Sequence, residues 1–343
     1  MNRKDDHIKY ALLQNQTTND FDEIRFVHNA ISDIALSDVN LKTNLCGMDF
    51  DYPIFINAMT GGSERAYEIN DRLSKLAKYF NIPIASGSVS AAIKDPSKSN
   101  SFKVIRKNYP NGIVMANIGA DKGLNAAKIA TELLDADILQ IHLNVVQEMI
   151  MPEGDRDFRN LESNISEIIN NLSVPVIVKE VGFGMSFEAL EKLKRLGVKT
   201  VDISGKGGTN FALIENARRD EKFENLNNFG LSTVESLLES IKVNDLEIIA
   251  SGGVRDAMDV VKSLALGAKA VGMSAFFLKL IINYNFDIVV KKVENLLLEI
   301  KAIMTILGKK NVQELKDTNI LVSNKLESFM RQRNIPLLVL NKR

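Results

Sequence analysis

The chain has 343 residues, of which 45% are hydrophobic and 25% charged, the composition of an ordinary soluble globular protein. Its 43 basic and 43 acidic side chains cancel, so the net charge gives no reason to expect a nucleic-acid or membrane partner. The single cysteine, Cys46, excludes an intramolecular disulfide, and no apolar stretch is long enough for a signal peptide or a membrane span. We therefore expect a cytoplasmic protein.

The first fifty residues are polar, and their first candidate strand is Asp33–Leu36. At the start of this segment, Arg3 to His7 places three potential cations and two carboxylates in five residues. Such an arm is either a solvated tail or a segment that folds over a site and binds phosphate through its arginine and lysine. Composition alone leaves both interpretations open.

From Pro53 onward, short apolar runs alternate with helical patterns. The predicted strands are 54–58, 83–87, 112–117, 138–143, 174–179, 200–204, 248–250 and 270–273. The predicted helices lie at 65–80, 102–107, 126–134, 161–172, 187–196, 233–241, after Asp256 and at 286–307. Eight parallel strands joined by helices close most naturally into a (β/α)8 TIM barrel.

We expect a single domain over residues 1–343. It would comprise an N-terminal arm and extension (1–50), the barrel (51–308) and a C-terminal helical tail (309–343). The tail ends in an apolar segment, 335–340, which we expect to pack on the barrel or on a neighbouring subunit.

The last two predicted strands both end in small residues. Ser251-Gly252-Gly253 follows the seventh strand, and Gly272 to Ala275 closes the eighth. Glycines let backbone N–H groups approach an anion closely, and the helix that follows adds its positive dipole end. Each glycine pair alone is more often a tight turn, but the two in this order favour a phosphate site of the kind found in TIM barrels.

Other strand ends add polar groups. Lys179 ends a buried strand, where an unpaired ammonium would be unfavourable. It therefore indicates either an anionic ligand or a structural salt bridge. The loop Gly205 to Thr209 lacks the Walker spacing, so a nucleotide triphosphatase is not expected. Two phosphate loops, a lysine and several amides suit a flat heteroaromatic cofactor with one phosphate, and flavin mononucleotide (FMN) is the economical interpretation.

Titratable side chains that could carry the chemistry are few. The only histidines are His7, His28 and His142, so the histidine that flavin-dependent 2-hydroxy-acid oxidases use after strand six is absent. The cysteine of purine-nucleotide dehydrogenases and reductases is also missing from that loop. His142 either belongs to the core or forms a ligand site with the amides that follow. Glu148 suits a Mg²⁺ ion shared with substrate phosphate oxygens.

Two motifs are specific: Arg3-Lys4-Asp5-Asp6-His7 and the stretch from His142 through Asn144 to Gln147-Glu148. Together with Ala58–Gly62, Lys179–Gly182 and Ser251–Gly253, they make the chain resemble the type 2, flavin-dependent isopentenyl-diphosphate isomerases over nearly its whole length.

This resemblance implies a role for each matching residue. FMN contacts are implied for Ala58, Met59, Thr60, Ser88, Asn117, Lys179, Ser204, Thr209, Gly253, Arg255, Ser274 and Ala275. Substrate contacts are implied for Arg3, Lys4, His7, His142, Asn144 and Gln147, with Gln147 also assisting catalysis, and Mg²⁺ binding is implied for Glu148.

The resemblance also implies a redox-neutral reaction, the interconversion of isopentenyl and dimethylallyl diphosphate in isoprenoid biosynthesis. It requires reduced FMN, with NADPH as the usual reductant and the flavin as the acid/base group, and it implies a homotetramer. One loop departs from the family pattern: Val89 replaces an amide, and Ser90 replaces a residue that is often arginine. The alternatives are a flavin oxidoreductase of another substrate and a flavin- or phosphate-binding module without catalysis.

Overall fold

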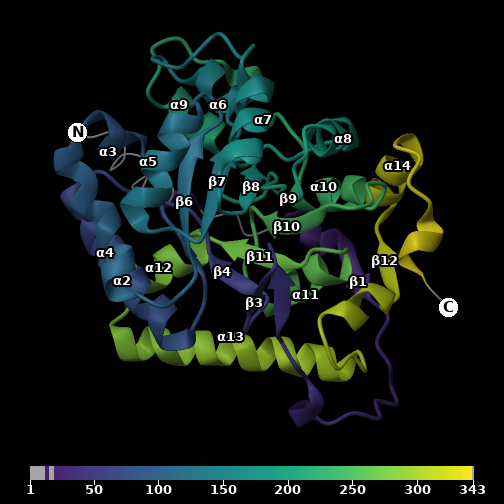
Figure 1. Ribbon diagram of the computed structural model, residues 1–343. Coiled ribbons are helices and arrows are strands. Elements are labelled where there is room, and N and C mark those ends of the chain that lie inside the picture. The colour runs from purple at the N-terminus through teal and green to yellow at the C-terminus, as the bar shows by residue number, and fades with distance from the viewer. Residues whose placement is uncertain (1–11, 15–18, 342–343) are drawn as a thin grey trace.

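Eight short parallel strands close into a barrel, in which neighbouring strands follow the order β10-β11-β4-β5-β6-β7-β8-β9 (Figure 1). The computed structural model describes residues 12–14 and 19–341. The barrel strands are β4 (Ile54–Ile56), β5 (Ile84–Ala85), β6 (Val114–Gly119), β7 (Ile138–His142), β8 (Val176–Lys179), β9 (Thr200–Asp202), β10 (Glu247–Ser251) and β11 (Ala270–Met273). The predicted (β/α)8 fold is confirmed.

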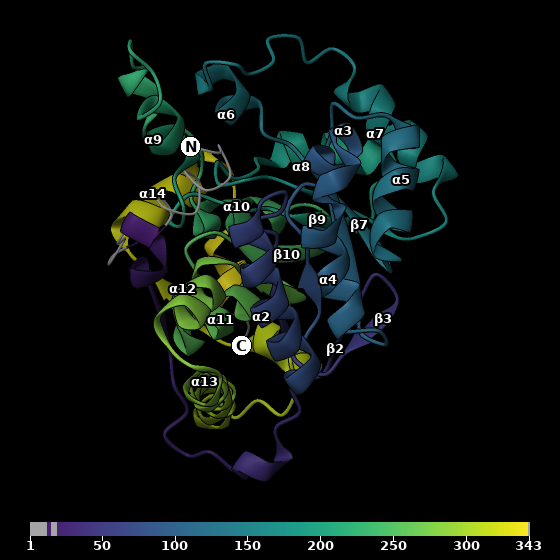
Figure 2. The ribbon, with the colours of Figure 1, turned by 90° about the vertical axis from the view of Figure 1, so that its left-hand side faces the viewer.

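Eight helices, one after each barrel strand, pack around the outside of the barrel (Figures 1 and 2). They are α2 (Glu64–Phe80), α4 (Asn100–Asn108), α5 (Leu124–Leu134), α7 (Leu161–Asn171), α8 (Phe187–Arg195), α10 (Thr233–Ser240), α11 (Ala257–Ala265) and α13 (Phe286–Ile306). Asp256 caps α11 as predicted, because its side chain accepts a hydrogen bond from the backbone N–H of Asp259.

Four further helices follow barrel strands: α3 (Ser90–Lys94), α6 (Val145–Ile150), α9 (Phe211–Asn216) and α12 (Ala275–Asn283). The sequence predicts long loops after the fourth and sixth strands, where α6 and α9 form. Helices of one or two turns carry too few residues to show a clear apolar period, which explains why α3, α6 and α9 are absent from the prediction, whereas a helix opening at Ala275 is predicted. All four begin at the carboxyl ends of strands, so they surround that end of the barrel.

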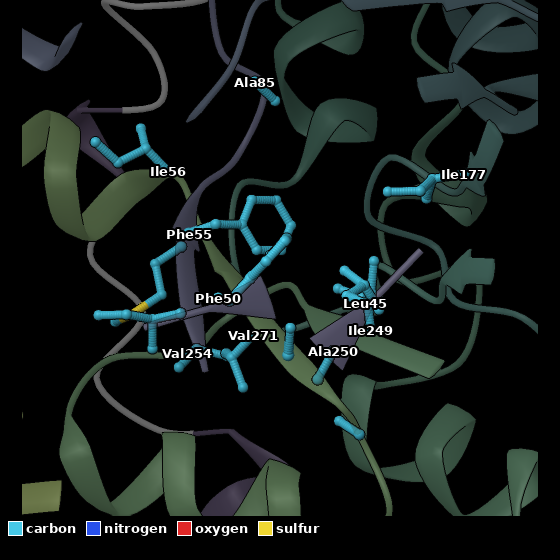
Figure 3. Close-up of a cluster of buried hydrophobic side chains, with 14 of the residues drawn as sticks. Leu45, Phe50, Phe55, Ile56, Ala85, Ile177, Ile249, Ala250, Val254 and Val271 are labelled. Carbon is cyan, nitrogen blue, oxygen red and sulfur yellow. The ribbon is translucent and has the colours of Figure 1, made fainter. Parts of the chain in front are cut away.

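Apolar side chains on both faces of the strands are buried, as Figure 3 shows for Phe55, Ile249 and Val271, all fully buried. A hairpin of β2 (Thr43–Leu45) and β3 (Met48–Phe50) covers the amino ends of the strands. At its tip, the backbone N–H of Cys46 donates to Glu247 at 2.9 Å. One end of the barrel is thus closed, and the carboxyl ends of the strands are left to form a site.

Burial raises the pKa of the Cys46 thiol to about 11, which leaves it a poor nucleophile. The thiol lies 3.4 Å from the Thr200 hydroxyl and is half-buried under the hairpin. We infer a structural role for this cysteine.

The N-terminal extension and the C-terminal tail meet in a small sheet outside the barrel. β1 (Ile24–Phe26) pairs antiparallel with β12 (Ile320–Val322), and Figure 1 shows the two strands side by side. The predicted strand at Asp33–Leu36 is wrong: Leu36–Asp38 forms a 3-10 turn, because the Asp38 carboxylate accepts the backbone N–H of Ala35.

The tail continues from β12 into α14 (Asn324–Gln332) and a 3-10 turn, Leu337–Leu340. Between α14 and this turn, Arg333 donates to the fully buried carboxylate of Glu239 on α10 at 2.7 Å. This bond fixes the tail to the outer helical layer. Within the described residues, no helix is both long and apolar enough to cross a membrane.

Candidate functional site

A cavity of about 940 Å³ opens at the carboxyl ends of the barrel strands. Residues from the ends of the barrel strands line it, as do side chains of α3, α6, α9 and α12. Figure 2 shows α6 and α9 projecting together beyond this end of the barrel. The cavity therefore lies where a TIM barrel places its chemistry.

The structure brings the predicted cofactor residues together around this cavity. The lining includes Ala58, Met59, Ser88, Asn117, Lys179, Ser204, Thr209, Gly253, Arg255, Ser274 and Ala275. Thr60 is the exception: it does not line the cavity, and its buried hydroxyl has no hydrogen-bond partner among the described residues. A buried hydroxyl without a hydrogen-bond partner destabilises the folded state unless a ligand or a water molecule supplies the missing hydrogen bond.

The predicted substrate and metal residues of α6 and β7 line the same cavity. They are His142, Asn144, Gln147 and Glu148. Asn144 donates to one oxygen of Glu148 at 2.7 Å, and the backbone N–H of Asp155 donates to the other at 2.8 Å. In the described part of the chain, no cluster of three or more histidine, cysteine or acidic side chains could hold a metal.

Arg3, Lys4 and His7 lie outside the described residues. The nearest described part of the N-terminal segment is residues 12–14, of which Gln14 lines the cavity. Its amide nitrogen donates to the Asn210 carbonyl at 3.1 Å, and its amide oxygen accepts the Asn210 N–H at 2.7 Å. This two-way bond fixes Gln14 beside the loop that leads into α9.

Glycines allow the loops after β9 and β10 to pack backbone against backbone. Gly252 and Gly253 have φ angles of +94° and +74°. A Cβ on Gly253 would lie 2.4 Å from the backbone of Gly207, and one on Gly208 would lie 2.6 Å from the Gly253 nitrogen. The glycines are thus required by the turn and by the loop contact, whatever ligand the loops bind.

Arg255 lies two residues after Gly253 and is paired with two carboxylates. Its guanidinium lies 2.7 Å from Asp259 and 2.6 Å from Asp22. Hydrogen bonding to Asp259, and then to Asp22, raises the pKa of Arg255. Much of its charge is therefore compensated before any ligand binds.

Gln147 belongs to a second polar network, which joins α6 to α9. Its amide donates to the fully buried Glu215 at 2.8 Å, and Arg218 donates to the other oxygen of Glu215 at 2.5 Å. Beneath it, Ile150, Phe183 and Ala212 form an apolar cluster separate from the barrel core. The sequence analysis missed Glu215, because a carboxylate on an unpredicted helix gives no local signal.

A chain of buried amides crosses the barrel below the cavity. Asp202 accepts from Asn57 at 2.8 Å, and Asn57 accepts from Gln140 at 3.1 Å. Gln140 in turn accepts from Asn117 at 3.1 Å, and Asn117 lies 2.9 Å from Nδ1 of His142. The sequence analysis missed Gln140 and Asp202, because each lies inside an apolar strand run.

Comparison with known proteins gives consistent relatives over the full chain. An isopentenyl-diphosphate delta-isomerase of Staphylococcus haemolyticus is 46% identical over 98% of this chain and 97% of its own length. One of Bacillus pumilus is 45% identical over 97% of this chain and 95% of its own. The family described as FMN-dependent dehydrogenase matches residues 115–322.

The chain belongs to the isopentenyl-diphosphate delta-isomerase family.

Solved structures support the fold of this family member. A flavocytochrome b2 variant with sulfite bound has a TM-score of 0.68 at 20% identity, covering 90% of this chain and 81% of its own. A mandelate oxidase variant has a TM-score of 0.64 at 14% identity, covering 94% of both chains. At these identities the likeness concerns the barrel alone.

The loop that departs from the isomerase family pattern still reaches the cavity. Ser88 and Ser90 line it, with their hydroxyls 3.0 Å apart, whereas Val89 is fully buried beneath them. Two lysines of the same segment, Lys94 and Lys98, also line the cavity, so the loop remains basic without an arginine at position 90.

At the end of β8, the lysine and glutamate of the family motif Lys179-Glu180-Val181-Gly182 are both buried. Lys179 donates to the Glu180 carbonyl at 2.5 Å. One oxygen of the Glu180 carboxylate accepts three backbone N–H groups, from Val181, Gly182 and Phe183, at 2.6 to 2.7 Å. Burial raises the pKa of Glu180 to about 7, against the opposing effect of these bonds and of Lys179.

This pKa predicts a pH-dependent stability. Below pH 4.5, Glu180 is protonated in both the folded and the unfolded chain; as the pH rises towards 7, the unfolded chain loses the proton first. The free energy of unfolding should therefore fall over this window, by on the order of 3 kcal/mol relative to Glu180→Gln. Urea unfolding of both proteins from pH 4.5 to 8 measures the difference.

Glu299→Gln, at an exposed position of α13, controls for the loss of one charge. Parallel pH curves for wild type and Glu180→Gln would contradict the raised pKa.

Proposed function

We propose that this protein interconverts isopentenyl and dimethylallyl diphosphate, with reduced FMN bound in the cavity at the barrel mouth. The observation that carries the proposal is the convergence of two residue sets on one cavity. The glycine loops and Lys179 suit a flavin phosphate and ring, while His142, Asn144, Gln147 and Glu148 suit a diphosphate and its hydrocarbon chain. The family of the chain supports the same assignment.

The donor set fits FMN. The buried Lys179 ammonium and the amide of Asn117, which both line the cavity, offer two kinds of polar contact to a heteroaromatic ring. The backbone at Gly253 and the start of α12 at Ser274 offer N–H groups to a phosphate. Reduced FMN held by these residues would supply an electron-rich ring face and an exchangeable proton.

The diphosphate end of the substrate would lie against His142 and Asn144, and Glu148 would hold a Mg²⁺ ion that would neutralise part of the diphosphate charge. A lone protein carboxylate is sufficient for an ion that takes its other ligands from phosphate and water. Arg3, Lys4 and His7 would close over the diphosphate. The bond between Gln14 and Asn210 supports this, because it holds Gln14 itself, seven positions after His7, at the cavity wall.

At the hydrocarbon end, the side chains must exclude water while an alkene gains and loses a proton, because the transition state has carbocation character. Val181 and Phe211 line the cavity, pack against the apolar cluster of Ile150, Phe183 and Ala212, and would serve this purpose. Glu215 holds the amide nitrogen of Gln147, which leaves the Gln147 oxygen oriented away from that carboxylate. We assign Gln147 the role of assisting proton transfer.

The remaining features come from the family resemblance and from composition. As proposed, the enzyme is a cytoplasmic homotetramer, NADPH reduces its flavin, and it has neither nucleic-acid nor membrane partners.

The first test is an anaerobic reaction with purified protein, FMN, Mg²⁺, NADPH and isopentenyl diphosphate. We expect many molecules of dimethylallyl diphosphate for each NADPH oxidised, because the reaction consumes no electrons. Product and NADPH are both measured over time. NADPH loss equal to product would indicate a flavin oxidoreductase instead, and flavin binding without product would leave a binding module.

Gln147→Ala should lower kcat about 100-fold at saturating substrate, because one group that assists proton transfer is lost. Flavin affinity should be unchanged. Met149→Ala, at an exposed position of the same short helix, is the matched control. A kcat equal to that of wild type would remove Gln147 from the mechanism.

Gly253→Ala should weaken FMN binding about tenfold, equivalent to about 1.4 kcal/mol, because the new Cβ must displace the Gly207 loop. Quenching of flavin fluorescence on titration gives the affinity. Gly267→Ala is the matched control, since Gly267 also has a positive φ, +109°, but its Cβ would meet nothing within 4 Å. Equal affinities for the two variants would show that the loop contact does not shape the flavin site.

A further inference from the structure

In the buried amide chain between Asp202 and His142, every amide donates its hydrogen bond towards Asp202. An amide can present either its oxygen or its NH₂ to a neighbour, so a chain of amides can in principle run either way. The links from Asp202 to Asn117 are buried: Asp202 and Gln140 are fully buried, and Asn57 and Asn117 are 2% and 3% exposed. Water therefore cannot compensate for a reversed link, and a reversal would leave like groups facing one another.

Two groups that cannot reverse fix the direction at Asn57. The backbone N–H of Ala58 can only donate, and it lies 2.8 Å from Oδ1 of Asn57. On the other side, Nδ2 of Asn57 donates to the Asp202 carboxylate. Asp202 also accepts the Ser251 hydroxyl at 2.6 Å and the Ser204 N–H at 3.1 Å. Asn57 must therefore present its oxygen to Gln140.

The orientation of Asn57 then determines the orientations of Gln140 and Asn117, which lie on the neighbouring strands β7 and β6. Gln140 donates to the Asn57 oxygen, so its own oxygen faces Asn117, its register partner across β6 and β7. Asn117 donates to that oxygen and so presents Oδ1 to Nδ1 of His142. An oxygen at 2.9 Å requires a proton on Nδ1.

We propose that this amide chain fixes neutral His142 as the Nδ1–H tautomer, and that Gln140 is the positioning residue that transmits the constraint. Gln140 does not line the cavity and acts only through Asn117. The neutral ring then carries its lone pair on Nε2, and it can donate from Nε2 to a phosphate oxygen only after gaining a proton. This last consequence rests on the proposed function, whereas the tautomer does not.

The test is ¹⁵N NMR of the full-length protein reconstituted with FMN and labelled at the histidine rings, without substrate. The chain has three histidines, and His142→Gln identifies the signals of His142. At a pH where these signals no longer move, we expect a proton on Nδ1 and a lone pair on Nε2. A predominant Nε2–H ring in the wild-type protein would overturn the proposal, and this measurement needs no folded variant.

Two substitutions test the role of Gln140. Gln140→Met keeps the length of the side chain but removes both amide bonds, so Asn117 can rotate, and the ratio of Nδ1–H to Nε2–H should fall about tenfold. Gln140→Glu keeps an oxygen for Asn117 to donate to, so the Nδ1–H tautomer should persist. An unchanged ratio in Gln140→Met, or equal falls in both variants, would overturn the role of Gln140. Because no substrate is present, failure of the isomerase assay would leave these results standing.

Discussion

A polar group enclosed in a barrel must form its hydrogen bonds with other groups of the protein. The carboxylate of Asp202 is the group in the barrel on which this constraint acts most strongly. Its carboxylate is fully buried at the end of β9 and accepts from Asn57, Ser204 and Ser251. These three donors lie at the ends of three different strands, which are far apart in the sequence. Satisfying one buried charge therefore aligns β4, β9 and β10 at the barrel mouth, and the cavity takes its shape from that alignment.

Much of this architecture could be predicted from local patterns. The barrel strands appear as short apolar runs, and Lys179 and His142 stand out because each ends such a run. The hairpin at Cys46 and the pairing of β1 with β12 could not be predicted, because each depends on partners distant in sequence. Local hydrogen bonding by Asp38 likewise outweighed the apolar run that predicted a strand before it.

The site was harder to predict than the fold, for a similar reason. Gln140 and Asp202 are polar residues inside apolar strands, and only the closed barrel shows that they belong to one chain of hydrogen bonds. Glu215 contacts Gln147 across 68 positions of sequence. A short motif identifies residues that meet a ligand, whereas the residues that orient them are recognisable only once the strands are in register.

The bond between Gln14 and Asn210 anchors the N-terminal segment to its own barrel at residue 14. From Gln14 back to His7 the chain can span at most about 25 Å. A group on so short a tether has an effective concentration near the cavity in the millimolar range. Weak individual contacts from the arm would thus suffice to cover the site, and they could release it again quickly enough for product to leave.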